Sequence, residues 1–270
     1  MARVRQKKEI RAAVLRAAGT NCDYETGYAL TLAGARPVLV HVRELLDGIK
    51  KLNDYHLLII PGGFSYGDDL GAGKLLANEV RYLLGEEMTR FVKAGKPVLG
   101  ICNGFQVLVK AGFLPEFQPG EWSQEMSLVA NDSARFECRW TFLKPNPKSP
   151  CVFTQGITEP IPVPIAHGEG KVVFRDALIQ EQVVNNNLVA FQYVDSEGNA
   201  GPYPVNPNGS AWDIAGICDP TGRILGMMPH PERHVHQWQH PWWTRRRHNE
   251  ARGAGLRIFE NAVQLCKDSL

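Results

Sequence analysis

The sequence predicts an α/β fold in a single domain, with a mostly parallel central sheet flanked by helices and extended by added antiparallel strands. Three observations support this class. Residues 11–60 alternate strand-like and helix-like runs, which is the pattern of a doubly wound parallel sheet. Residues 56–60 form an apolar run, as expected of a central strand covered on both faces. After residue 113 the chain is rich in Pro, Trp and Phe and alternates in polarity, which indicates antiparallel strands.

The first half of the chain supplies the parallel layer. We expect strands at 11–18, 37–42, 56–60 and from 96 to 99, and helices at 24–33, 43–52, 75–94 and from 107 to 111. Glycine ends three of these helices, at Gly34, Gly95 and Gly112.

The second half supplies the added strands. We expect antiparallel strands within 113–165, a polar loop at 165–170, turns and hairpins at 185–210, a hairpin of 214–217 with 224–228, and a helix at 253–268. Proline at 160, 162 and 164 favours an edge strand or an extended loop there.

Composition limits the function classes. The 270 residues carry a net charge of +2, so nothing demands nucleic acid or an anionic membrane as a partner. The chain has no apolar run of about 18 residues, and no apolar run follows its basic N-terminus, so we expect neither a transmembrane helix nor a secretory signal. The six cysteines show no metal-ligand spacing and are typical of free thiols in a reducing compartment. We therefore expect a cytoplasmic protein without a metal site, with a flexible basic N-terminus at 1–10 and one domain at 11–270.

A cysteine occupies a predicted strand-to-helix turn. In Gly100-Ile101-Cys102-Asn103-Gly104-Phe105-Gln106, glycine lies two residues before and two residues after the cysteine. This is the spacing of a nucleophile elbow, with cysteine in place of serine. The following helix N-terminus favours a thiolate. A buried structural cysteine is the alternative for this motif alone.

Two other segments could complete such a site. Pro61-Gly62-Gly63-Phe64-Ser65-Tyr66-Gly67-Asp68 follows a central strand, where exposed backbone N–H groups could form an anion cradle or oxyanion hole, or a simple flexible turn. His230-Pro231-Glu232 follows another strand, and in extended geometry residues 230 and 232 point to the same side. The carboxylate could then orient the imidazole as a base for the thiol. A metal site at His234, His236 and His240 is the weaker use of histidine, because carboxylate and cysteine partners are lacking nearby.

These motifs together resemble the class I glutamine amidotransferases, the triad glutaminases of flavodoxin-like fold, and within them the glutaminase subunits of phosphoribosylformylglycinamidine synthase. The motifs that carry the resemblance are G-I-C-N-G-F-Q, P-G-G-F-S-Y-G-D, P-H-P-E and the segments 19–23, 131–137, 167–170 and 206–210. They follow the family's order over nearly the whole chain.

The resemblance implies a role for each site residue. Cys102 would attack the side-chain amide of glutamine and form a thioester, with His230 as base and then acid and Glu232 orienting it. Backbone N–H groups near Gly63, Phe64 and Asn103 would form the oxyanion hole. The glutamine-binding residues would be Gln106, His167 and Gly168.

The resemblance also implies partners. Ammonia would pass to a large synthetase subunit that binds ATP, magnesium and formylglycinamide ribonucleotide, and a third small subunit would bridge the two. No cofactor is expected in this chain.

Two other functions remain open from the sequence. A cysteine hydrolase or peptidase of related fold would share the elbow and a histidine, but its histidine usually follows soon after the nucleophile, whereas Cys102 and His230 are 128 residues apart. A catalytically silent scaffold that only binds a synthetase should have lost the cysteine or the histidine, and both are present here.

Overall fold

The computed structural model describes residues 9–117, 120–245 and 251–269. The basic residues at 3–8 lie outside these ranges, so the flexible N-terminus predicted at 1–10 stays a prediction. Within the described ranges, no helix has both the length and the apolar character needed to span a membrane.

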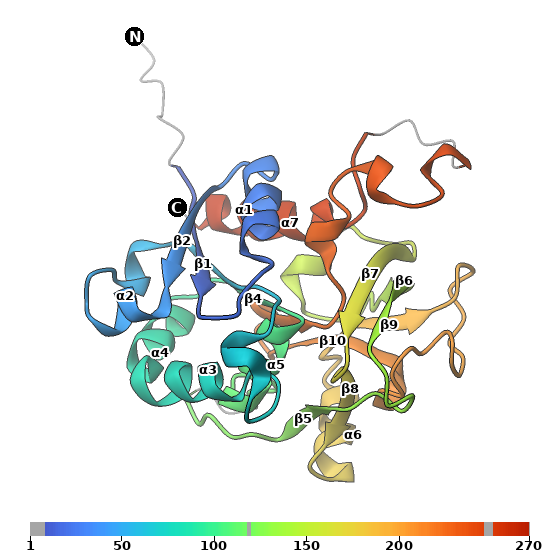
Figure 1. Cartoon of the computed structure of the whole chain (residues 1–270), viewed down its shortest axis with the longest axis horizontal. Coiled ribbons are helices and arrows are strands. Elements are labelled where there is room, and N and C mark those ends of the chain that lie inside the picture. Colours follow the sequence, from blue (N-terminus) through green and yellow to red (C-terminus); the bar gives the residue numbers. More distant parts are fainter. Residues whose placement is uncertain (1–8, 118–119, 246–250, 270) are drawn as a thin grey trace.

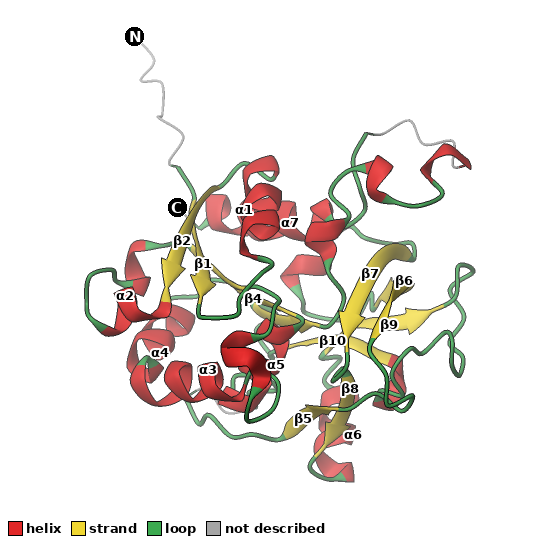
Figure 2. Ribbon diagram, viewed as in Figure 1, coloured by secondary structure: helices red, strands yellow, loops and turns green. Residues whose placement is uncertain are grey.

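The centre of the molecule is a nine-stranded sheet (Figures 1 and 2). Its strands in spatial order are β2 (Arg36–His41), β1 (Arg11–Arg16), β3 (Leu57–Ile60), β4 (Val98–Ile101), β11 (Ile224–Met227), β10 (Ile214–Cys218), β9 (Val189–Val194), β6 (Glu137–Pro145) and β7 (Ile161–His167). The first five run parallel, and β10, β9, β6 and β7 extend the sheet in antiparallel fashion. A separate two-stranded sheet pairs β5 (Met126–Val129) with β8 (Lys171–Phe174).

Helices cover both faces of the parallel strands. The helices are α1 (Asp23–Leu32), α2 (Val42–Leu46), α3 (Lys74–Asn78), α4 (Gly85–Lys93), α5 (Asn103–Ala111), α6 (Ala177–Asn185) and α7 (Leu256–Asp268). In the view of Figure 1, α1 and α7 lie above the parallel strands, whereas α3, α4 and α5 lie below them. The predicted α/β class with added antiparallel strands is therefore confirmed.

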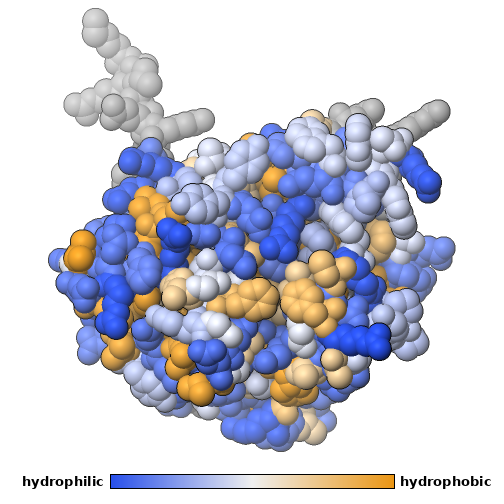
Figure 3. Space-filling model, in the orientation of Figure 1, coloured by the Kyte–Doolittle hydropathy of each residue, from blue (hydrophilic) through white to orange (hydrophobic). Residues whose placement is uncertain are grey.

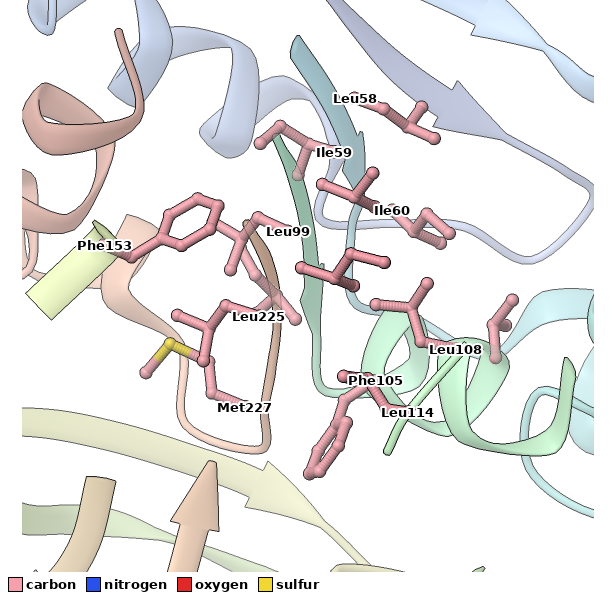
Figure 4. Close-up of a cluster of buried hydrophobic side chains, with 14 of the residues drawn as sticks. Leu58, Ile59, Ile60, Leu99, Phe105, Leu108, Leu114, Phe153, Leu225 and Met227 are labelled. Carbon is pink, nitrogen blue, oxygen red and sulfur yellow. The ribbon is translucent and has the colours of Figure 1, made fainter. Parts of the chain in front are cut away.

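The core lies between the parallel strands and these helices. Strands β3, β4, β10 and β11 are buried along their whole length, which explains their continuous apolar sequence. Figure 4 shows Leu58, Leu99 and Leu225 of three neighbouring strands together with Phe105 and Leu108 of α5. The face of the molecule in Figure 3 is mainly hydrophilic, with apolar side chains in small groups. The packing of the core holds β4 and α5 in place, and these two elements flank the cysteine turn.

The helix predicted at 75–94 is wrong as a single helix. The segment forms α3, which continues as a π-helical turn over Glu79–Leu83, and then α4, with the interruption at Leu84. The Leu84 N–H donates to the carbonyl of Glu79, five residues earlier, and the unfavourable helix former Gly85 follows directly. The amphipathic pattern spans the interruption because buried residues recur at helical spacing on both sides of it.

Three further differences lie in the second half. The loop predicted at 165–170 begins only after His167, because residues 165–167 pair with β6. Strand β5 does not join the main sheet. Helix α6 was not predicted, although Asp176 begins it by accepting a hydrogen bond from the Ile179 N–H at 2.9 Å. The prolines at 162 and 164 lie in β7, which is an edge strand as predicted.

The carboxyl ends of the parallel strands position the site. The turn at 19–22 follows β1, the glycine segment at 61–68 follows β3, Cys102 follows β4, and His230 follows β11. Because these strands are parallel neighbours, their ends meet at one edge of the sheet. Residues that are far apart in the sequence therefore converge there.

Gly104→Ala should destabilise the fold by roughly 1–3 kcal/mol, because a Cβ at this position would collide with the backbone carbonyl of Ile60. The matched control is Gly85→Ala, where an added Cβ meets nothing within 4 Å. This substitution should change the free energy of unfolding by less than about 1 kcal/mol. Urea unfolding followed by far-ultraviolet circular dichroism measures both. Equal midpoints for the two variants would contradict this account of the α5–β3 contact.

Candidate active site

Cys102 lies at a strained turn between β4 and α5. Its backbone is at φ 51° and ψ −106°, a positive φ that a residue with a Cβ rarely adopts. The turn is tight because Gly100 and Gly104 approach each other: a Cβ on Gly100 would lie 2.6 Å from the Gly104 carbonyl oxygen. The Cys102 Sγ is directed to the carbonyl oxygen of Ala166 at 3.6 Å. The predicted elbow is thus present, with its thiol at the start of a nine-residue helix.

His230 and Glu232 form a buried pair beside this turn. The His230 Nδ1 lies 2.6 Å from the Glu232 Oε1, and both residues are 2% exposed. The segment after His230 is a short 3-10 turn, so the predicted extended geometry is wrong, although the predicted contact forms. Burial disfavours the imidazolium, but the charges of Glu232 and Cys102 favour it, and the pKa of His230 lies well above its usual value.

Gly62 allows the histidine and the cysteine to approach each other. A Cβ on Gly62 would lie 2.7 Å from the His230 Cε1 and 3.4 Å from the Cys102 Cβ. Within the described residues, the His230 Nε2 is buried and has no hydrogen-bond partner. The ring therefore keeps one nitrogen for Glu232 and one for a proton transfer on the side of the thiol.

The side chain of Asn103 joins the cysteine turn to the glycine segment. Its Oδ1 accepts from the Ser65 N–H at 3.2 Å, and its Nδ2 donates to the Asp68 Oδ1 at 3.2 Å. Tyr66 and Asp68 have positive φ values of 55°, so this segment is strained like the elbow. A movement of the glycine segment would therefore break or shift the hydrogen bonds of the Asn103 side chain.

The predicted oxyanion donors differ in their availability. The Phe64 N–H donates to the carbonyl oxygen of Gly19 at 3.0 Å, so that donor is occupied by the protein itself. Gly63 has φ +144°, and a Cβ there would lie 2.8 Å from the Asn21 nitrogen. Asn103 follows the nucleophile at the free N-terminus of α5. The oxyanion roles of Gly63, Phe64 and Asn103 remain predictions.

Two of the predicted glutamine-binding residues are tied to protein groups. The Gln106 side chain donates to the Glu169 carbonyl oxygen at 2.6 Å and accepts from the Asn103 Nδ2 at 3.0 Å. The carbonyl oxygen of Gly168 accepts from the Asn131 N–H at 2.9 Å. The Gln106 bond joins the 167–170 loop to α5, the helix that follows the nucleophile, and the Gly168 bond joins the loop to Asn131. The binding roles of Gln106 and Gly168 remain predictions.

His167 is a buried neutral base. Its Nδ1 lies 3.1 Å from the Asn131 Oδ1, and its Nε2 has no hydrogen-bond partner within the described residues. Burial and the nearby charge of His230 lower its pKa to about 3. Its neutral Nε2 is thus available for a hydrogen bond to a ligand, and its predicted binding role remains open.

The sequence did not reveal the side chains behind the triad. The Cys22 Sγ lies 4.0 Å from the His230 Nδ1, and Arg233 donates to this sulfur at 3.2 Å and to the Glu25 Oε1 at 2.9 Å. The segment 19–23 was noticed only as a motif. No local pattern gives the contact of Cys22 with a residue 208 positions away.

Within the described residues, one group of side chains has the identity and spacing to hold a metal ion, and it is Cys22, Glu25, His230 and Glu232. His234, His236 and His240 do not form such a group there. They lie among aromatic rings instead: His234 and His240 pack against Trp140, and His236 stacks on Trp238. The weaker metal hypothesis for these three histidines has no support in the geometry.

Comparisons with known proteins identify the family of this chain. The family model described as a CobB/CobQ-like glutamine amidotransferase domain matches residues 9–266. The chain is 50% identical over 257 residues to the phosphoribosylformylglycinamidine synthase subunit PurQ of Dehalococcoides mccartyi, covering 95% of this chain and 97% of that protein. It is 44% identical over 259 residues to the protein of the same name in Methanococcus maripaludis, covering 91% and 93%.

A solved structure gives the same result for the fold. The structure of PurLQS from Thermotoga maritima contains a chain with a TM-score of 0.71 and 32% identity. The match covers 96% of this chain and 99% of that chain.

His167→Asn should make stability less sensitive to acid. Because the folded pKa of His167 is depressed to about 3, the unfolded chain binds a proton at this residue below about pH 6.5 and the folded chain does not. Stability therefore falls as the pH falls, by about 2 kcal/mol between pH 7 and pH 5 for this group. Urea unfolding at several pH values should show a decline smaller by that amount in the variant. An unchanged decline would mean that His167 is not held neutral.

Proposed function

The chain belongs to the CobB/CobQ-like glutamine amidotransferase family, and we propose that it works as the glutamine-hydrolysing subunit of a phosphoribosylformylglycinamidine synthase. The observation that carries the proposal is the buried His230–Glu232 pair beside a cysteine on a strained turn. In this role the chain hydrolyses glutamine to glutamate and ammonia. A partner synthetase uses the ammonia to convert formylglycinamide ribonucleotide to formylglycinamidine ribonucleotide in purine biosynthesis.

The first half-reaction forms a thioester. The Cys102 thiolate attacks the amide carbon of the glutamine side chain, and a carbon–sulfur bond forms while the carbonyl oxygen gains negative charge. The His230 imidazolium then gives its proton to the amide nitrogen, so that the carbon–nitrogen bond breaks and ammonia leaves. The raised pKa of His230 supports this step, because it keeps the proton on the ring near neutral pH.

The second half-reaction releases glutamate. Neutral His230 takes a proton from water, and the resulting hydroxide equivalent attacks the thioester carbon. The carbon–sulfur bond breaks, glutamate leaves, and the thiolate and imidazolium are restored. Glu232 holds the ring through Nδ1 in both steps and stabilises its charged form.

The glycine segment at 61–68 regulates this chemistry in the proposal. The Phe64 N–H is bound to Gly19, so it can serve the oxyanion only after the segment moves. The Asn103 side chain links such a movement to the nucleophile through Ser65 and Asp68. We expect the synthetase partner to cause the movement, which would couple ammonia release to the presence of an acceptor.

L-glutamine is the substrate of this chain, a small bridging subunit completes the complex, and ATP and magnesium act on the synthetase. The proposal places no cofactor in this chain and places the complex in the cytoplasm. All six cysteines are free, which agrees with a reducing compartment.

Cys102→Ala should abolish glutamate release from glutamine, with a loss of at least about 10³-fold, because the variant lacks the thiol that forms the thioester. Glutamate is measured with the purified chain alone and with a phosphoribosylformylglycinamidine synthetase subunit, and the partner should raise the rate of the unmodified chain. The matched control is Cys138→Ala, which removes an exposed thiol on β6 and should leave the rate unchanged. Release that survives Cys102→Ala would disprove the assignment of the nucleophile, and no release in any mixture would favour a scaffold.

Glu232→Gln should lower the rate of glutamine hydrolysis. It should also make the enzyme lose activity at a lower alkaline pH. The Glu232 charge raises the pKa of His230, so its removal lets the imidazolium lose its proton at lower pH. We expect kcat to fall by roughly 10²-fold or more and the alkaline limb of the pH–rate profile to move to lower pH. Glu44→Gln, on α2 away from the site, is the control and should keep the unmodified profile. A rate loss without a shift of the alkaline limb would exclude this electrostatic role.

A further inference from the structure

We propose that a second cysteine behind the triad completes a binding site for a thiophilic divalent cation of the zinc class, and that a cation bound there stops catalysis. The four ligating side chains are Cys22, Glu25, His230 and Glu232. One ligand atom from each lies within 4.8 Å of all the others. The inhibitory effect, but not the binding, rests on the proposed glutaminase function.

The donor set fits zinc in type and spacing. Zinc takes thiolate sulfur, imidazole nitrogen and carboxylate oxygen, usually four in a tetrahedron, with bonds of about 2.0–2.3 Å. Ligand atoms around such an ion lie roughly 3–4 Å apart. The Cys22 Sγ is 4.0 Å from the His230 Nδ1, so these two need little movement. The 2.6 Å contact of His230 with Glu232 has to open slightly as the ion replaces its shared proton.

A cation already occupies the outer side of this cluster. Arg233 donates from Nη2 to the Cys22 Sγ at 3.2 Å and from Nε to the Glu25 Oε1 at 2.9 Å. The local charge therefore favours a positive group between the sulfur and the carboxylate. The Arg233 side chain is 35% exposed and the Glu25 side chain 39%, so the guanidinium can turn to solvent and leave a path for an ion.

The buried side of the cluster is the catalytic pair itself. Cys22, His230 and Glu232 are each at most 2% exposed. Within the described residues, the Glu232 Oε2 has no hydrogen-bond partner, so this carboxylate keeps an oxygen that can serve as a ligand. An ion bound at these atoms would sit behind the imidazole, opposite the side that serves Cys102.

Binding there would stop the triad without touching its nucleophile. The ion takes the His230 Nδ1 lone pair, and the Nδ1 proton and the Cys22 thiol proton leave to solvent. Glu232 then binds the ion instead of orienting the ring. The metal-bound ring keeps its proton on Nε2, where it has no free lone pair, so His230 can no longer accept a proton in the second half-reaction.

The binding test uses Co²⁺ as a spectroscopic substitute for zinc on the full chain carrying Cys102→Ala, which removes the other thiol near His230. We expect a thiolate-to-cobalt charge-transfer band in the near ultraviolet, lost on addition of Zn²⁺ or a chelator. Cys22→Ser in this background should abolish the band, whereas the matched change Cys138→Ser should retain it. A band that survives Cys22→Ser, or no band in the folded parent chain, would overturn the proposal.

Arg233→Ala provides a second measurement that does not depend on a loss of signal. Removal of the competing guanidinium should tighten Co²⁺ binding by about tenfold, which corresponds to about 1.4 kcal/mol. Circular dichroism checks that each variant is folded. Weaker or unchanged binding in the folded Arg233→Ala chain would show that the ion does not replace the guanidinium, which the proposal requires.

The inhibitory effect is tested by glutamate release with the synthetase partner present. Half-inhibition of the Cys22→Ser chain should need at least about tenfold more Zn²⁺ than that of the unmodified chain. Equal sensitivity would overturn the inhibitory role, because zinc would then act elsewhere. If the unmodified chain releases no glutamate at all, the proposed function fails, and the cobalt band alone decides whether the site exists.

Discussion

The close approach of α5 to the parallel strands is the constraint on which the rest of the site depends. Gly104 brings the start of the helix against the Ile60 carbonyl, and Gly100 brings β4 against the same turn. With both positions lacking a Cβ, the chain can turn tightly at Cys102, where φ is 51°. Such a conformation costs of order 1–3 kcal/mol, which the packing of the fully buried strand β4 and helix α5 can offset. The thiol therefore lies at the sheet edge, on a turn that the packing of β4 and α5 holds in place.

The same edge imposes an electrostatic constraint. A buried ion pair such as His230–Glu232 has a large desolvation cost, which is repaid only when its hydrogen bonds are well formed. Here the pair is held by the end of β11 and by the turn that begins at Pro231. Gly62 leaves room for the imidazole, because a side chain at this position would occupy the same space. The glycines of the elbow and of the 61–68 segment thus serve one purpose, which is to let three loops meet without side chains between them.

The sequence predicted the parts of this site that depend on short-range pattern. The elbow around Cys102 and the acid next to His230 are visible within a few residues, and the apolar strands before them identify the sheet edge. Helix α6 was missed although Asp176 caps it, because its weak amphipathic pattern resembles a loop beside the asparagine-rich turns that follow. The interruption at Leu84 was missed because buried residues recur at helical spacing on both sides of it. The contact of Cys22 with His230 depends on how β1 and β11 lie in the sheet, and no periodicity in a single sequence encodes strand order.

The surroundings of Cys22 also explain why the acids at this edge can lie so close together. Glu25 and Glu232 carry like charges next to a polarisable sulfur, and an uncompensated cluster of this kind would raise the energy of the folded state. Arg233 directly follows Glu232, the carboxylate that orients His230, and it supplies the compensating charge through bonds to the sulfur and to Glu25. One short turn thus carries the base, its orienting acid and the cation that balances them. The position of the imidazole therefore depends on the cation behind it as well as on the carboxylate beside it, so a change of cation there is a change in the triad.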